Sequence, residues 1–457
     1  MKFTKMSLVA ALLIGSSAFA LDNIKVSGDA NLYYQTTDGA SGYDKAKGRK
    51  SGDLFSKDSS AADASLNLNI TADVLANDLV SVSAGAGYTV LTTLGLENNL
   101  VSNVWGGAHT GTAGTGAQYA NLPDVGGAKV ENASWMNEAW IAATAGKTTA
   151  KIGRMALDTP LAFTETWSAE QNTFEAIVVV NQDIPNTTLV GAYIGNGNGT
   201  ENFGQNAQSN VQGLGLATAP VVNGNGKFTT YGQDGAYGAG VINNSIESLT
   251  LQAWYYDVTR TANAYWLQAD LDASSLGVKG LILGAQYSGI NVYKTVNVDG
   301  TTPLAAGNKD VSSGVFAVMA GYAVEDMATI KLAYSSVDKD HSAGFNTATN
   351  AGTAQSKLYT EAWWNYGHVT LADTQAYNVT VTSPVNGLFD LGLYYTYADQ
   401  AKATDAATPG AGDMTEFTTT AGKSFGPLDL TAAYIYTDFG KAGGSNNTVQ
   451  VYASVNF

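Results

Sequence analysis

The last ten residues of the chain, TVQVYASVNF at 448–457, alternate between two sets of side chains. One face of an extended chain would carry Val449, Val451, Ala453, Val455 and Phe457, and the other Gln450, Tyr452, Ser454 and Asn456. Side chains of a β-strand point alternately to its two sides, so this period of two predicts an amphipathic strand that ends the chain at an aromatic residue. A soluble edge strand that happens to end in Phe is the alternative interpretation.

The same period of two recurs along the chain from about residue 24. In 62–72, for example, six apolar side chains alternate with polar ones such as Asp63 and Asn67. Segments of about ten residues have the length of tilted strands that cross a bilayer. We predict eighteen strands, at 24–35, 62–72, 79–90, 134–144, 148–154, 173–181, 187–195, 235–243, 248–257, 262–271, 280–288, 313–323, 328–337, 374–383, 388–398, 415–425, 428–437 and 448–457.

The lengths of the connections distinguish a membrane barrel from a soluble β-sandwich, which also alternates. Short turns are expected at 73–78, 243–248, 324–327 and 426–427, and long loops at 36–61, 91–133, 196–234, 288–312 and 337–373. Bilayer-spanning barrels have short periplasmic turns and longer extracellular loops. The predicted fold class is therefore all-β: one transmembrane antiparallel β-barrel of about eighteen strands, wide enough to enclose an aqueous channel.

Many tyrosines lie near the ends of the predicted strands. Such barrels carry girdles of aromatic rings at both membrane interfaces, whereas tyrosines of a sandwich are more often in the core. We therefore expect a girdle that includes Tyr33, Tyr34, Tyr88, Tyr255, Tyr256, Tyr334, Tyr397 and Tyr436.

The segment Leu358–Asn365 also has strand character. Bacterial single-chain barrels have even strand numbers, and a further strand here would put a long loop on the periplasmic side. We assign the segment to a long extracellular loop. The alternative is that it replaces the strand at 374–383.

Residues 1–20 have the pattern of a secretory signal peptide. Lys2 and Lys5 precede an apolar run over 6–14, and small residues lead to Ala18-Phe19-Ala20. A membrane anchor is the alternative, but the run has about half of the ~20 residues that a spanning helix needs. We predict cleavage after Ala20 and one barrel domain over 21–457, exported to a bacterial outer membrane.

Composition agrees with a protein whose outer face contacts lipid. Only 14% of the 457 residues are charged, whereas about a quarter is usual in soluble domains. The absence of cysteine excludes a disulfide scaffold. Residues 1–20 hold two lysines and no acid, so their removal takes the formal charge from −16 to −18. Nucleic acid is excluded as a partner, because it binds positive surfaces. Cationic solutes or divalent ions are the expected partners instead.

Several of these segments resemble a known family. The terminal strand is similar to the C-terminal signature that the outer-membrane assembly machinery recognises. Together with residues 1–20, 25–34 and 241–251, it resembles the campylobacterial major outer-membrane porins. The segment 152–161 resembles the strand-to-third-loop junction of the related OprD-like porins. The resemblance implies an eighteen-stranded porin, a homotrimer, and a third loop folded into the pore. The family's ladder of basic residues has little counterpart here, since the chain has three arginines, Arg49, Arg154 and Arg260.

The third loop is the predicted pore constriction. Between residues 155 and 175 the chain carries four acids and no base, and acidic clusters in pores favour cations. Lys151 and Arg154, with Lys147, lie just before the loop and would set up a transverse field. The alternative is that the acids lie on a solvated outer loop. The predicted constriction residues are Lys151, Arg154, Asp158, Glu165, Glu170 and Glu175.

Alternation also predicts which charged residues line the interior. Charge on a lipid-facing wall is costly, so charges within strands should point inward. Simple solvation of the wall is the alternative role for each one. The predicted lumen residues are Asp29, Glu138, Asp270, Lys331, Asp390 and Glu416.

The sequence gives no sign of an enzyme. His109, His341 and His368 fall in predicted loops without the spacing of a zinc site, and the chain has no Gly-x-Ser-x-Gly motif. We therefore expect no catalytic residues, no metal and no cofactor.

The predicted function is a water-filled, cation-preferring diffusion channel for small hydrophilic solutes. The rival is a barrel without an open pore that acts as a surface adhesin or structural anchor. The expected partners are outer-membrane lipid and lipopolysaccharide, small hydrophilic solutes and cations, and two further copies of the chain. A basic cluster in the first outer loop would touch lipopolysaccharide phosphates or is simply solvated: Lys45, Lys47, Arg49 and Lys50.

Overall fold

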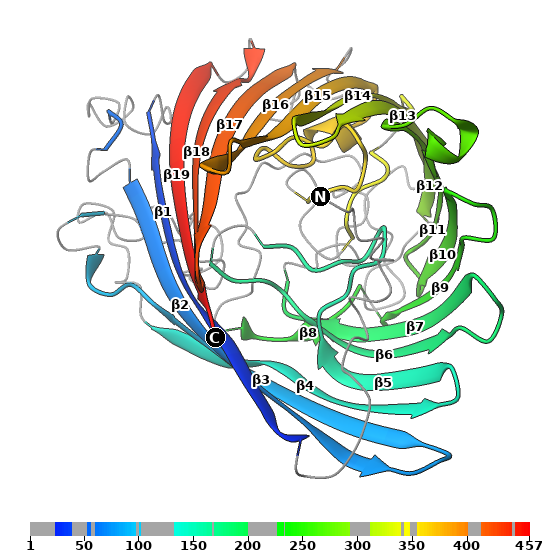
Figure 1. Cartoon of the computed structure of the whole chain (residues 1–457). Helices are drawn as coiled ribbons and strands as arrows, with labels where there is room; N and C mark the ends of the chain where they lie inside the picture. The colour runs from blue at the N-terminus through cyan, green and yellow to red at the C-terminus, as the bar shows by residue number, and fades with distance from the viewer. Residues whose placement is uncertain are drawn as a thin grey trace, which may run out of the picture.

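The computed structural model is a closed antiparallel β-barrel of eighteen wall strands (Figure 1). It describes residues 23–38, 53–55, 60–96, 100–101, 132–166, 169–199, 226–232, 234–292, 311–339, 342–347, 354–400, 413–440 and 444–457. The predicted signal peptide over 1–20, the basic cluster at 45–50, His109 and His341 lie outside these residues. Among the described residues, no helix has the length and hydropathy needed to cross a bilayer.

The strands follow the predicted order, each within a few residues of the expected ends. They are β1 (Lys25–Thr37), β2 (Ser60–Ala76), β3 (Ser81–Thr92), β4 (Ala133–Ala145), β5 (Thr148–Met155), β6 (Phe174–Asn181), β7 (Thr187–Gly197), β8 (Thr229–Thr230), β9 (Ala236–Asn243), β10 (Leu249–Val258), β11 (Ala262–Asp272), β12 (Leu281–Val292), β13 (Val311–Val324), β14 (Ala328–Val337), β15 (Thr374–Val385), β16 (Phe389–Gln400), β17 (Met414–Phe425), β18 (Leu428–Asp438) and β19 (Ser445–Asn456). The two-residue β8 extends the rim beside β7, and the wall itself continues from β7 to β9.

The two ends of the chain close the barrel. β1 pairs with β19 as well as with β2, and the register sets Tyr33 opposite Tyr452. Beyond β19, Gly28 and Phe457 exchange two backbone hydrogen bonds, of 2.8 and 3.0 Å. The predicted closure of the last strand onto the first is confirmed, and it leaves no open edge in the sheet.

The outer wall is apolar, the reverse of a soluble protein. Leu66, Leu68 and Ile70 of β2 are exposed, whereas Ser65 and Asn67, which alternate with them, are buried inside. Burying a large apolar side chain is worth about 1.5–3 kcal/mol, so a wall of this kind is stable only against an apolar medium. The wall matches the hydrocarbon of a bilayer.

Aromatic rings pack across neighbouring strands on this outer wall. Tyr334 lies between Phe316 and Tyr377, with ring centroids 5.8 and 5.1 Å away. Two tyrosines that we expected in the girdle, Tyr33 and Tyr256, are instead buried inside the barrel. Tyr33 is next to Tyr34 in the sequence, and Tyr256 is next to Tyr255. Adjacent residues of a strand face opposite sides, so only one of each pair can point outward.

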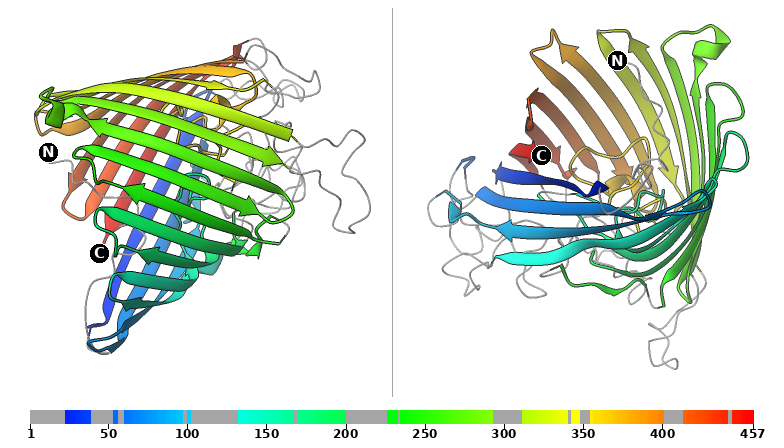
Figure 2. Two further views of the ribbon diagram at one scale, coloured as in Figure 1. Left: turned by 90° about the vertical axis from the view of Figure 1, so that its right-hand side faces the viewer. Right: turned by 60° about the horizontal axis from the view of Figure 1, so that its bottom comes forward.

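Short turns lie at one end of the barrel, and the strands enter the long connections at the other (Figure 2). Gly426 and Pro427 alone join β17 to β18, whereas residues 338–373 separate β14 from β15. The segment Leu358–Asn365 lies in this second connection and forms no strand, as we assigned it.

Candidate functional site

Two segments fold into the barrel from its long-loop end, and we call them the inward loops. The first is 156–173, between β5 and β6, and the second is 338–373, between β14 and β15; their described parts lie inside the ring of strands (Figure 1, teal and yellow). The inward fold of the first loop is the arrangement that the constriction prediction required.

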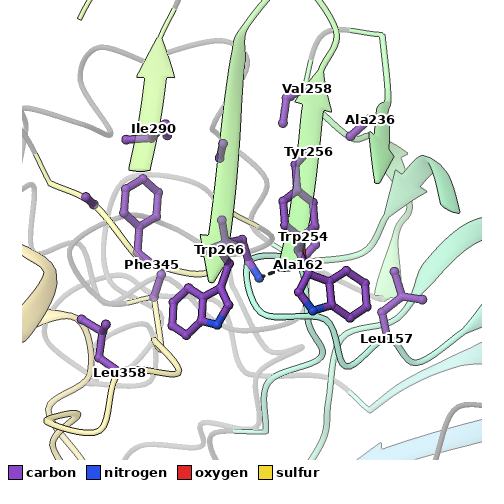
Figure 3. Close-up of a cluster of buried hydrophobic side chains, with 14 of the residues drawn as sticks. Leu157, Ala162, Ala236, Trp254, Tyr256, Val258, Trp266, Ile290, Phe345 and Leu358 are labelled. Atoms are coloured by element: carbon purple, nitrogen blue, oxygen red, sulfur yellow. Dashed lines mark hydrogen bonds between the residues drawn. The ribbon is translucent and has the colours of Figure 1, made fainter. Parts of the chain in front are cut away.

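The inner wall over β6–β13 carries a large cluster of buried apolar side chains and receives both inward loops. Leu157 and Ala162 of the first loop belong to one buried cluster with Trp254 and Tyr256 of β10 (Figure 3). Phe345 and Leu358 of the second loop join the same cluster, beside Trp266 of β11 and Ile290 of β12. Because each such buried side chain contributes about 1.5–3 kcal/mol, apolar contact holds the loops against this half of the wall.

A side-chain amide joins the two loops to each other. Asn346 of the second loop accepts the backbone N–H of Phe163 at 3.1 Å and donates to its carbonyl oxygen at 2.8 Å. It also donates to Glu165 Oε1 at 2.7 Å. Lys357 of the second loop forms an ion pair with Asp158 of the first. The loops therefore form one packed unit.

The opposite side of the interior is polar and holds an open cavity of about 280 Å³. It lies between the first inward loop and the wall strands β1, β2, β4 and β19. Amides, hydroxyls and carboxylates provide most of its lining: Asp29, Asn31, Asn67, Asn69, Asn137, Glu138, Thr166, Glu170, Gln171 and Ser454, with Tyr33 and Tyr452. We call this space the polar cavity.

Three carboxylates, Asp29, Glu138 and Glu170, line the polar cavity, and no lysine or arginine is among its described lining residues. Asn67 donates from Nδ2 to Asp29 Oδ2 at 2.9 Å and to Glu170 Oε1 at 3.0 Å. Burial raises the pKa of Glu170 to about 7, although hydrogen bonds from Ser65 and Asn67 favour its ionised form.

A β-bulge in β4 puts two consecutive side chains into the polar cavity. β3 and β4 pair with a register shift between Gly87 and Tyr88, which leaves Asn137 without a partner across the ladder. Asn137 and the following Glu138 therefore both line the cavity, although adjacent residues of a regular strand face opposite sides.

The acids of the first inward loop occupy different environments. Glu170 lines the polar cavity, but Glu165 is fully buried and accepts hydrogen bonds from Asn346 and from the backbone N–H of Gln355. Asp158 is paired with Lys357, a base that the span 155–175 does not contain.

Arg154 and Glu175 lie on the outer face of the wall, not in the constriction where we expected them. They pair across β5 and β6 next to Ile152 and Ile177, which are exposed outside. Arg154 Nε donates to Glu175 Oε1 at 2.8 Å, and Asn196 donates to Glu175 Oε2 at 2.6 Å. The pair lies at the ends of the strands beside the long loops, where it need not enter the hydrocarbon.

Lys151 points inward, opposite the buried Ala142 and Val178. Its Nζ lies 4.1 Å from the centre of a Trp140 ring, and Trp140 donates to Glu138 Oε2 at 3.0 Å. Lys151 is thus a base next to the polar cavity on the β4–β5 side.

Of the other predicted lumen residues, two contact the second inward loop and two lie on the wall without such a contact. Glu416 is buried and accepts the backbone N–H groups of Trp364 and Asn365, at 3.0 and 2.7 Å. Asp270 accepts the hydroxyl of Tyr359 at 2.5 Å. These two acids hold the second inward loop. Lys331 and Asp390 are exposed on the wall, close to the short turns.

Sequence reasoning did not identify Asn67, Asn137 or Lys357 as parts of the site, because amides and single lysines carry no motif. Nor did it predict that 338–373 folds inward. The one available signal was its apolar content, which includes Phe345, Leu358 and Val369. Among the residues that the structure describes, no three His, Asp or Glu side chains converge on a point where a metal ion would bind.

Fold and site together define a class of protein: a closed antiparallel barrel with an apolar outer wall. Two inward loops narrow its interior and leave one polar side open. Solved structures with this fold are OprD/Occ-family outer-membrane porins of Pseudomonas and Acinetobacter. Pseudomonas aeruginosa OpdK, in a crystal structure with vanillate, matches with a TM-score of 0.65 at 15% identity, covering 95% of this chain and 99% of its own.

Pseudomonas aeruginosa OccK8 (OprE) matches with a TM-score of 0.65 at 14% identity, over 95% of this chain and 98% of its own. Acinetobacter baumannii OccAB1 gives 0.67 at 12% identity, over 95% and 97%. No family model matches the chain, and no curated protein matches it. At these identities the similarity establishes the fold.

Proposed function

We propose that the protein is an outer-membrane porin, a water-filled channel through which small hydrophilic solutes diffuse, and that it prefers cations. The polar cavity is the conducting route, since the inward loops pack against the apolar side of the interior. The observation that carries the proposal is the lining of this cavity, in which Asp29, Glu138 and Glu170 supply three carboxylates.

Carboxylates next to a low-dielectric wall act at short range and are screened less than exposed charges, so a few of them set the ion preference of a narrow pore. Lys151 stands behind Trp140 and outside the lining. Among the described residues, the charged groups that line the route are therefore all negative. Of the four acids in 155–175 that we predicted for the constriction, Glu170 alone lines the cavity.

The location and assembly of the protein are parts of the same proposal. The predicted signal peptide would direct export, with cleavage after Ala20, and the apolar wall would insert into the outer membrane beside lipopolysaccharide. The resemblance to campylobacterial porins supports a homotrimer. As part of the same proposal, we expect no enzymatic reaction, no resident metal and no cofactor.

Single-channel recording in planar lipid bilayers tests the proposal. The purified full chain should produce stepwise current increases that reflect permanently open pores. A folded barrel that inserts without carrying current would contradict the porin proposal and favour the rival function, a surface adhesin or structural anchor.

A further inference from the structure

The side chain of Asn67 holds together two carboxylates from different parts of the chain. Asp29 belongs to the wall strand β1, and Glu170 belongs to the first inward loop. One amide nitrogen donates to both, at 2.9 and 3.0 Å. Thr89 fixes the amide from the other side, because its hydroxyl donates to Asn67 Oδ1 at 2.5 Å. All of these contacts are buried or partly buried.

We propose that Asn67 sets the ion selectivity of the polar cavity by holding Asp29 and Glu170 side by side, and that a proton taken up by this pair weakens the preference for cations. The proposal rests on the porin function above. It adds a residue that determines the ion selectivity and a dependence of that selectivity on pH. Asn67 is a positioning residue here, since it acts through the two carboxylates.

Among the residues that the structure describes, the acids around Glu170 lie on three wall strands. Asp29 on β1 and Asp63 on β2 act on its charge, and Glu138 on β4 lines the same cavity. Asp29 and Asp63 disfavour a further negative charge, and burial of Glu170 acts in the same direction. Asn67 and Ser65 oppose them by bonding the ionised form. The charge of Glu170 therefore depends on a balance between its neighbours.

This balance places the titration of Glu170 near neutral pH, since its pKa is raised to about 7. Above that pH Glu170 is mostly ionised, and below it mostly neutral. The cavity should then lose part of its attraction for cations on mild acidification, at a pH where an ordinary glutamate would remain ionised.

The test is the reversal potential across a bilayer under a salt gradient, measured from pH 5 to 9 on the full-length barrel. In wild type we expect cation selectivity to fall with acidification in a step centred near the pKa of Glu170. Glu170→Gln should abolish the step and show the lower, acid-side selectivity throughout. Persistence of an unchanged step in Glu170→Gln would overturn the inference.

Two further variants should move the step in opposite directions. Asn67→Leu removes donors that favour the ionised form, so the midpoint should rise by about one pH unit. Asp29→Asn removes a like charge, so the midpoint should fall. Asn291→Leu repeats the amide exchange at an exposed position on β12 and should leave the midpoint in place.

Circular dichroism establishes that each variant is folded, and Asn67→Ala takes the place of Asn67→Leu if the leucine variant does not fold. A midpoint that stays fixed in the folded Asn67 variant would contradict the role of Asn67. A channel that prefers cations but shows no step between pH 5 and 9 would refute this inference and leave the porin function intact. A barrel that carries no current would refute both.

Discussion

The ammonium group of Lys357 bonds the carboxylate of Asp158 and so ties together two inward loops whose residues lie 199 positions apart in the sequence. Asp158 retains 41% of its side-chain exposure, so water screens the pair. In a double-mutant cycle of Lys357→Met and Asp158→Asn, we expect a coupling of no more than about 1 kcal/mol in the free energy of unfolding. Lys357→Met alone should leave the reversal potential close to that of wild type, because Asp158 lies outside the lining of the polar cavity. A large shift of the reversal potential in Lys357→Met would contradict this.

Glu416 should be the stronger anchor of the second inward loop. It is buried and accepts two backbone N–H groups of that loop, and glutamine would turn an N–H donor toward them. We expect Glu416→Gln to cost about 1–3 kcal/mol of stability and to raise conductance and current noise. Asp399→Asn, at an exposed acid of the neighbouring β16, serves as the control for chemical denaturation and recording. Quiet channels of wild-type conductance in Glu416→Gln would show that the loop does not depend on this contact.

Closure of the barrel should depend on the absence of a side chain at Gly28. A Cβ added there would lie 2.3 Å from the carbonyl oxygen of Asn67 and 2.7 Å from Cζ of Phe457. Gly28→Val and deletion of Phe457 should therefore both reduce the amount of folded barrel in the outer membrane. Gly191→Ala is the matched control, because an added Cβ at Gly191 meets no atom within 4 Å. Membrane fractionation measures the outcome, and wild-type amounts of both variants would refute the prediction.

Alternation predicted the strands, and the rules that bacterial barrels have even strand numbers and no open edge predicted their number and the closure. The reason is physical: a wall with lipid on one side and a polar interior on the other imposes a period of two on every strand. The same alternation also placed Arg154 on the outer face, but we assumed that charged residues within strands point inward and so predicted it in the constriction. Arg154 is two residues after Ile152, on the face that alternation assigns to the outside.

The site was less predictable because it depends on contacts between distant residues. Nothing near Asp158 in the sequence indicates that Lys357 will neutralise it, and nothing near Glu416 indicates that it will cap 364–365. The bulge at Asn137 is likewise a property of the β3–β4 pairing. Asp29 and Glu138 were predicted to face the lumen, but only the folded loops define which side of the interior remains open.

The reversal potential of a neutralised cavity tests the central proposal most directly. The decisive variant combines Asp29→Asn, Glu138→Gln and Glu170→Gln. Its matched control removes three exposed acids from the short turns, by Asp183→Asn, Glu247→Gln and Asp326→Asn. Under a salt gradient at pH 8, wild type and the control should both prefer cations, and the cavity variant should lose that preference. A cavity variant as cation-selective as wild type would show that ions pass by another route.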